Sequence, residues 1–264
     1  MALSEYEITN KLSISVNKLS IPAEEAYKTL RTNIRFCGVV NKIKTITITS
    51  CAPDEGKTTT SINLAISMAN AGLKTLLVDT DLRLPAIERT LGFNNKIGIT
   101  NYITREIDLE DVIYKTNIEN FYIIPCGAVP PNPTELLSTE KFSEFIEIVS
   151  SQYLRVVKGQ LDMIIFDAPP LGSVIDAAIL SAQTDGVLLV IRPKTVNYKL
   201  ASQVKEQLEK ANAHILGVVL NKITKKDLAY GYKYYYNKDL TGKKTSRFRN
   251  FKRKRRNDRA DTFV

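Results

Sequence analysis

Residues 44–59, with the sequence KTITITSCAPDEGKTT, contain the pattern that decides the fold. Residues 45–49 alternate threonine and isoleucine, which is typical of a buried β-strand. The stretch from Lys57 to Ala71 carries an apolar helical face. Between the two, the loop ends in Gly56-Lys57-Thr58, the second half of a Walker A pattern, although Cys51 stands where the first glycine is usual. Strand, loop and helix in this order predict a phosphate-binding loop.

The chemistry of such a loop gives its residues individual roles, because backbone N–H groups and a helix N-terminus together surround an anion. We expect Lys57 to contact the β- and γ-phosphates, Thr58 to bind Mg²⁺ and Thr59 to contact the α-phosphate of a nucleoside triphosphate. A polar turn with an incidental lysine is the alternative. The residues expected to contact the nucleotide are Ala52, Pro53, Asp54, Glu55, Gly56, Lys57, Thr58 and Thr59.

Short apolar runs alternate with helical patterns along the rest of the chain. The predicted strands span 44–50, 74–80, 121–125, 162–167, 186–192 and 215–220, and the predicted helices span 22–36, 57–71, 139–157, 176–183 and 196–211. This alternation predicts an α/β fold: a P-loop NTPase-like, mostly parallel sheet with helices on both faces, an N-terminal helical arm and a flexible C-terminal tail. We expect an extension over 1–21, a P-loop domain over 22–228 with its arm at 22–38, and a tail over 229–264.

Acidic residues follow two of the predicted strands. Asp79 and Asp81 end one strand in the sequence LLVDTDLR, which Arg83 completes, and Asp167 ends another in MIIFDAPP. Ligands of open α/β sheets bind outside the carboxyl ends of the strands, so these carboxylates should approach Lys57. There they can hold Mg²⁺ directly or through water, whereas capping of the next helix is the alternative. Arg83 has two equal interpretations, stabilising phosphate charge or fastening its own loop.

Composition excludes several classes of protein. The chain has 264 residues, of which 44% are hydrophobic and 25% charged, as in an ordinary globular protein. Three cysteines without metal-type spacing and a single histidine argue against zinc enzymes and histidine-dependent triads. No apolar run approaches the roughly 20 residues that span a bilayer, and the first 20 residues lack a signal-peptide pattern. We therefore expect a cytoplasmic protein.

The basic charge is concentrated at the C-terminal end. The formal net charge is +9, but residues 1–221 hold 22 Lys and Arg against 24 Asp and Glu, while residues 222–264 hold 15 against 4. Nine basic residues and no acidic one lie between Lys243 and Arg256. Such a segment predicts either an anionic partner or a merely solubilising tail.

On these residues the sequence resembles the bacterial tyrosine kinases, or BY-kinases, of capsule and exopolysaccharide synthesis, in particular the cytoplasmic type of Firmicutes. LLVDTDLR, at 76–83, is similar to the family's Walker A′ motif, and Asp167 occupies the Walker B position. EAYKTLR, at 25–31, resembles the oligomerisation motif Glu-x-x-Arg-x-x-Arg, from which Lys28 departs. The tail holds a tyrosine cluster like that of the family, made of Tyr230, Tyr232, Tyr234, Tyr235 and Tyr236.

The resemblance implies a protein-tyrosine kinase that uses ATP and Mg²⁺ and phosphorylates this cluster on a neighbouring subunit. The expected catalytic residues are Lys57, Asp79, Asp81 and Asp167. Asp81 and Asp167 would orient the metal with Thr58, and Asp79 would accept the proton of the tyrosine, although the roles of Asp79 and Asp81 stay interchangeable at this stage. Asn221 would contact the base.

The resemblance also implies partners. Glu25, Lys28 and Arg31 would support a homo-oligomer such as a ring, unless they only pair along a solvated helix face. A membrane-bound activator of the polysaccharide co-polymerase type would hold the kinase at the membrane, and other proteins would offer further tyrosine substrates. The basic tail would contact an anionic membrane surface, with nucleic acid the less favoured partner.

Two other functions remain open. A MinD- or ParA-like P-loop ATPase would share most of the pattern, but those proteins usually carry a second lysine near the start of the loop, where this chain has Ala52. A non-catalytic, nucleotide-dependent adaptor with an anion-binding tail is the second alternative.

Overall fold

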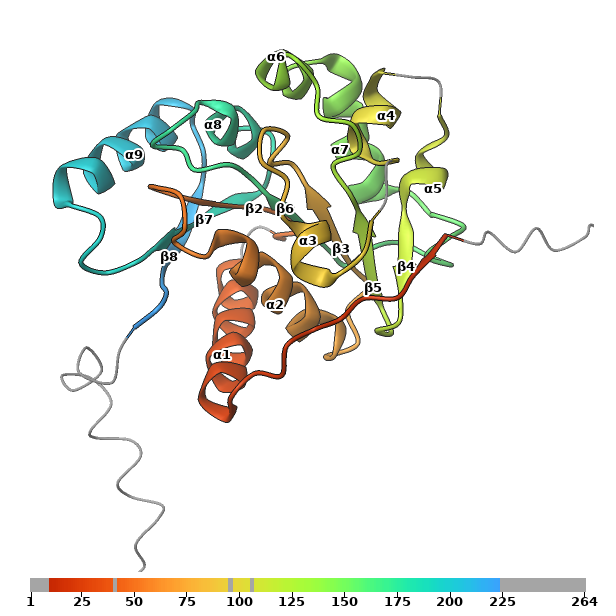
Figure 1. The fold of residues 1–264 in the computed structure, drawn as a ribbon, viewed down its shortest axis with the longest axis horizontal. Helices are drawn as coiled ribbons and strands as arrows, with labels where there is room; N and C mark the ends of the chain where they lie inside the picture. The colour runs from red at the N-terminus through yellow and green to blue at the C-terminus, as the bar shows by residue number, and fades with distance from the viewer. Residues whose placement is uncertain (1–9, 40–41, 95–96, 105–106, 224–264) are drawn as a thin grey trace, which may run out of the picture. The chain divides into compact units, whose positions relative to one another are not determined.

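The computed structural model describes residues 10–39, 42–94, 97–104 and 107–223 (Figure 1). Within these residues, eight strands form one sheet in the order β1-β4-β5-β3-β6-β2-β7-β8. Neighbouring strands run parallel except β4 and β5, which are antiparallel. The strands are β1 Lys11–Leu12, β2 Thr45–Ser50, β3 Thr75–Asp79, β4 Tyr114–Thr116, β5 Phe121–Ile124, β6 Met163–Asp167, β7 Gly186–Ile191 and β8 Ile215–Leu220.

All six strands expected from the sequence are present, and the mostly parallel α/β fold is confirmed. β2, β3, β5 and β6 are buried along their whole length, which explains their continuous apolar or β-branched character. β1 and β4 were not expected. They are two and three residues long, too short for a repeating pattern, and they extend the sheet at its edge beyond β5.

The helices also exceed the expected set. They are α1 Ile21–Cys37, α2 Lys57–Ala69, α3 Ile87–Leu91, α4 Ile99–Thr104, α5 Leu109–Val112, α6 Pro133–Leu137, α7 Glu140–Ser151, α8 Asp176–Ser181 and α9 Tyr198–Lys210. The N-terminal arm is α1, which has a proline in its first turn and packs against α2. Helices α3 to α6 were missed because four to six residues cannot display a helical period.

The helix expected over 139–157 is too long, because α7 ends at Ser151. Its N-terminus is as expected, since the Thr139 side chain accepts a hydrogen bond from the backbone N–H of Phe142. Beyond Ser151 the backbone N–H groups of Arg155 and Val156 donate to the Glu110 carboxylate. The apolar residues Val156 and Val157, which extend the helical pattern in the sequence, are therefore buried although they belong to a turn and not to a helix.

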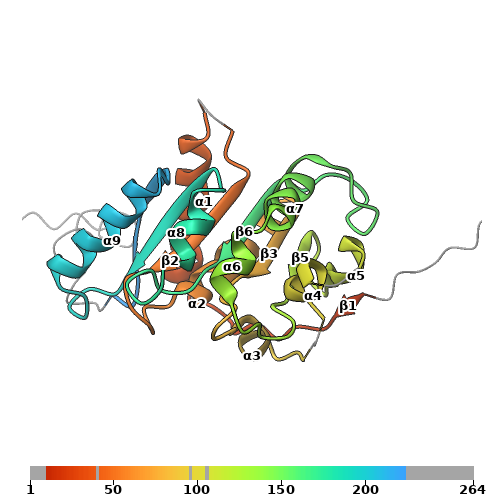
Figure 2. The same cartoon turned by 90° about the horizontal axis from the view of Figure 1, so that it is seen from above.

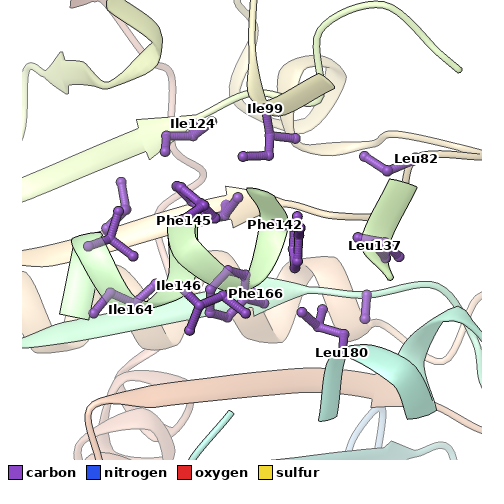
Figure 3. Packing of buried hydrophobic residues seen from close by; sticks show 14 of the residues in the cluster. Leu82, Ile99, Ile124, Leu137, Phe142, Phe145, Ile146, Ile164, Phe166 and Leu180 are labelled. Carbon is purple, nitrogen blue, oxygen red and sulfur yellow. The ribbon is translucent and has the colours of Figure 1, made fainter. Parts of the chain in front are cut away.

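The core has one layer on each face of the sheet. Buried side chains of α1, α2 and α3 pack on one face, against β2, β3, β5, β6 and β7. Helices α4 to α9 contribute to the other, where α6 lies beside α8 (Figure 2). There Phe145 meets Phe166 of β6 edge-on, with ring centroids 6.3 Å apart (Figure 3). Helices on both faces leave the carboxyl edge of the sheet free to form a site.

Candidate active site

The order of the strands brings the expected carboxylates to one place. β6 lies between β2 and β3, so the loop after β2 adjoins the ends of both acidic strands. Asp79 of β3 is directly opposite Asp167 of β6 in the sheet register. Asp79, Asp81 and Asp167 are all buried. The site therefore concentrates three carboxylates beside the phosphate-binding loop.

Lys57, the first residue of α2, neutralises this cluster. Its Nζ lies 2.7 Å from Asp81 Oδ2 and 3.8 Å from Asp167 Oδ2. Burial disfavours the charged ammonium, but the carboxylates of Asp167 and Asp81 outweigh burial and raise the pKa of Lys57. The lysine therefore stays charged. Its ammonium group can leave a carboxylate and bind a phosphate instead.

Asp167 is bound by two hydroxyl groups of α2. Thr58 Oγ1 donates to its Oδ2 over 2.6 Å, and Ser61 Oγ donates to its Oδ1 over 2.9 Å. Burial raises the pKa of Asp167, against the opposing effect of Lys57 and these hydroxyls. Sequence reasoning missed Ser61, whose only signal is its position one helical turn after Thr58. Carboxylate and hydroxyl oxygens are the donors that Mg²⁺ prefers, so Thr58, Asp81 and Asp167 fit the expected metal.

Asp79 holds the backbone of the acidic loop. Its Oδ1 accepts the N–H of Asp81 at 3.3 Å, and its Oδ2 accepts the N–H of Ile87 at 3.2 Å. Burial raises the pKa of Asp79 well above its usual value, and the charge of Asp167 adds to this effect. Asp79 is thus a buried carboxylate with a high affinity for a proton.

Arg83 fastens its loop to the neighbouring helices. Its Nε donates to Asp176 Oδ2 at 2.7 Å, and its Nη2 donates to Asp176 Oδ1 at 3.2 Å and to Thr134 Oγ1 at 2.9 Å. Asp176 opens α8 and is buried, whereas Thr134 belongs to α6. This geometry favours the structural interpretation of Arg83 over contact with a phosphate.

The buried side chain of Glu55 holds the backbone of the phosphate-binding loop through hydrogen bonds. Its buried carboxylate accepts the backbone N–H groups of Ala52 and Arg192, each at 2.7 Å. Burial raises the pKa of the Cys51 thiol to about 11, and the charge of Glu55 adds to this effect. Glu55 therefore joins the loop to the end of β7. Around it, Pro53 and Asp54 are exposed, as is Thr59 in the first turn of α2.

Asn221 and Lys222, which follow β8, contact the same loop. Asn221 Nδ2 donates to the carbonyl of Glu55 at 2.9 Å, and Lys222 Nζ donates to the carbonyl of Asp54 at 2.6 Å. Gly56 has a φ of 92°, and a Cβ at this position would lie 2.1 Å from Asn221 Nδ2. Only glycine fits this approach without displacement of the asparagine. The residue expected to bind the base therefore lies against the nucleotide loop.

The expected oligomerisation residues lie together on α1. Lys28 Nζ is 2.6 Å from Glu25 Oε1, and the Arg31 guanidinium donates to the carbonyl of Ser67 on α2. These contacts are made within one copy of the chain. The expected phosphorylation sites Tyr230, Tyr232, Tyr234, Tyr235 and Tyr236 lie outside the described residues. In the described ranges, no helix is long and apolar enough to cross a membrane.

Comparison with known proteins identifies the family. A family model described as an AAA domain matches residues 43–222. The tyrosine-protein kinase CpsD of Streptococcus agalactiae is 41% identical over 209 residues, which cover 79% of this chain and 87% of that protein. The crystal structure of the chimerical protein CapA2B2 matches with a TM-score of 0.72 and 31% identity, and covers 81% of this chain and 93% of that chain.

A septum site-determining protein is also similar. MinD of Pyrococcus horikoshii, solved in complex with Mg-ADP, matches with a TM-score of 0.55 and 31% identity over 67% of this chain and 69% of that chain. The tyrosine-protein kinase CpsD is more similar in sequence to this chain than MinD is, and its match covers more of both chains, so the comparisons favour a kinase over a MinD-like ATPase. The chain belongs to the bacterial tyrosine-protein kinases.

Proposed function

We propose that this kinase transfers the γ-phosphoryl group of ATP to the tyrosine cluster at 230–236 of a second copy, and that this transfer regulates the synthesis of a capsular or extracellular polysaccharide. The observation that carries the proposal is the position of Lys57 between Asp81 and Asp167, directly after a phosphate-binding loop. Phosphoryl transfer needs mainly positioning and charge neutralisation, and this cluster supplies both.

The loop binds the triphosphate through backbone N–H groups and the N-terminus of α2. When ATP binds, Lys57 exchanges its contact with Asp81 for the β- and γ-phosphate oxygens. The release of Asp81 frees a carboxylate beside Thr58 and Asp167. These three residues would hold Mg²⁺, which would supply charge neutralisation for the β- and γ-phosphates.

Asp79 accepts the proton of the incoming tyrosine. The tyrosine oxygen forms a bond to the γ-phosphorus, the bond from that phosphorus to the β–γ bridging oxygen breaks, and ADP leaves. The raised pKa of Asp79 suits a proton acceptor, and each of its oxygens retains a lone pair besides the one used by the backbone N–H. Asp81, engaged with the Lys57 ammonium, is suited to orient the metal.

The proposal extends to the proteins and surfaces that this kinase binds. The copies assemble through α1, with Glu25, Lys28 and Arg31 at the contact, and a membrane-bound activator of the co-polymerase type recruits the kinase. Basic residues between Lys243 and Arg256 strengthen this association at an anionic surface, where each Lys or Arg contributes about 1 kcal/mol.

Mass spectrometry of the chain after incubation with ATP and Mg²⁺ tests the function, with Lys57→Met as the inactive control. We expect phosphate on the tyrosine cluster of the unchanged chain and none on the control. Release of inorganic phosphate without phosphotyrosine would instead indicate an ATPase, and neither product would indicate an adaptor.

Transfer between copies is tested by mixing. An active copy in which all five cluster tyrosines are replaced by phenylalanine is combined with the Lys57→Met copy, whose tyrosines are intact. We expect phosphate on the Lys57→Met copy. Failure of this mixture, while the unchanged chain labels itself, would show that transfer occurs within one chain.

A further inference from the structure

A pocket of about 530 Å³ lies between the segments that follow β3 and β5. Its lining includes Glu88, Arg89 and Phe93, which follow β3, and Gly127 and Ala128, which follow β5. In the sheet order, β5 and β3 lie on one side of β6 and β2, whereas Asn221 follows β8 on the other side. The pocket is therefore separated from the expected base site by the phosphate-binding loop and Lys57.

The walls of the pocket are continuous with the active site. Asp79 accepts the backbone N–H of Ile87, which begins the helix that carries Glu88 and Arg89. Cys126 precedes Gly127, and burial raises the pKa of its thiol to about 12, with further contributions from Asp79, Glu88 and Asp81. The Cys126 thiol, next in sequence to the lining residue Gly127, is thus within electrostatic reach of these three carboxylates.

The chemistry of the lining suits a phosphorylated aromatic group. The Arg89 side chain is exposed, and it makes no ion pair with any residue that the structure describes. Phe93 contributes a half-buried ring. The carboxylate of Glu88, also in the lining, opposes an anion, so binding of a phosphate depends on Arg89. A planar guanidinium binds phosphate through two parallel hydrogen bonds, and a ring beside it packs against a phenyl group.

We propose that this pocket binds a phosphotyrosine of the substrate cluster while a neighbouring tyrosine of the same cluster receives the next phosphate. The proposal rests on the proposed function, because it requires the cluster to be the substrate. Cluster tyrosines are one or two residues apart, so an extended segment separates alternate tyrosines by roughly 7 Å. One phosphate already in place then anchors the segment, and phosphorylation becomes sequential.

The test uses the mixed-copy reaction described above, with the active, phenylalanine-substituted copy as kinase and the Lys57→Met copy as substrate. Intact mass spectrometry follows the number of phosphates on each substrate chain with time. We expect singly phosphorylated chains to be consumed about tenfold faster than unphosphorylated ones, which corresponds to one charge-assisted hydrogen bond.

Arg89→Gln in the kinase copy should abolish this advantage and leave the rate of the first phosphorylation unchanged. Arg155→Gln is the matched control, because Arg155 is an exposed cation that does not line the pocket. Phosphates that accumulate independently, or an advantage that survives Arg89→Gln, would overturn the pocket assignment. Absence of any phosphate on the substrate copy would contradict transfer between copies instead.

Discussion

The carboxylate of Glu55 accepts the backbone N–H of Arg192 over 2.7 Å, across 137 positions of sequence. The same carboxylate holds the N–H of Ala52, at the start of the phosphate-binding loop. Two neighbouring strands, β2 and β7, are thereby linked at their carboxyl ends through one buried side chain. The shape of the loop is consequently fixed before a nucleotide enters it.

Glu55→Ala should raise the KM for ATP about tenfold and reduce kcat less, because the variant loses loop preorganisation and not a catalytic group. Glu55→Gln should give an intermediate KM, since its amide oxygen retains one acceptor. Steady-state phosphorylation kinetics measure both, and thermal unfolding confirms that each variant is folded. A folded Glu55→Ala variant with an unchanged KM would contradict the role of Glu55.

Lys57→Met should lower the phosphorylation rate at least 10²-fold, about the loss seen when one charge-stabilising contact is removed. It should also destabilise the nucleotide-free protein at neutral pH, because Asp81 and Asp167 lose the cation beside them. Chemical denaturation with and without Asp81→Asn measures this. The second substitution should recover part of the lost stability in the Lys57→Met background, and equal stability of all forms would contradict the ion cluster.

The free energy of unfolding should depend on pH through the titration of Asp79. Its pKa is raised in the folded state, so the folded protein binds a proton that the unfolded chain releases near pH 4. Stability from this group is therefore present at low pH and is lost as pH rises through the folded pKa. Relative to the unchanged protein, Asp79→Asn should become progressively more stable as pH rises from about 4. Unfolding measured in a pH series checks this, and a difference independent of pH would exclude a raised pKa.

Arg83→Ala should lower the free energy of unfolding by about 1–3 kcal/mol, because it leaves the buried Asp176 without its cation. This loss is small for an ion pair with one buried partner, because the Arg83 side chain is 39% exposed and solvent weakens its interaction with Asp176. The KM for ATP of the folded variant should not change. A double-mutant cycle with Asp176→Asn isolates the pair, and a large rise in KM would instead place Arg83 on a phosphate.

The sequence was most informative where function requires a local pattern. The approach of Asp79, Asp81 and Asp167 to Lys57 was predictable, because the three carboxylates follow apolar strands, Lys57 follows the loop after another strand, and the geometry of parallel sheets brings such ends together. Ser61 was missed, since a serine inside a helix has many ordinary explanations.

Contacts between distant residues were not predictable in the same way. Arg83 and Asp176 are 93 positions apart, and no local signal connects them. The length of α7 was overestimated because Val156 and Val157 continue its apolar pattern, while Glu110, 46 positions before Val156, binds the backbone there. A periodic apolar pattern indicates which residues are buried. It does not indicate whether a helix or a turn carries them.

Strand β1 has a consequence for the order in which the chain folds. Lys11 pairs with Lys115, and Asn117 bonds the backbone of Ile14, so Lys11 and Ile14 gain these partners only after more than 100 further residues. At a synthesis rate of about 5–20 residues per second, that delay is roughly 5–20 s. During this interval the segment has no strand to join. Residues 11–14 therefore dock after β4 has formed, which makes the closure of this edge a late event in folding.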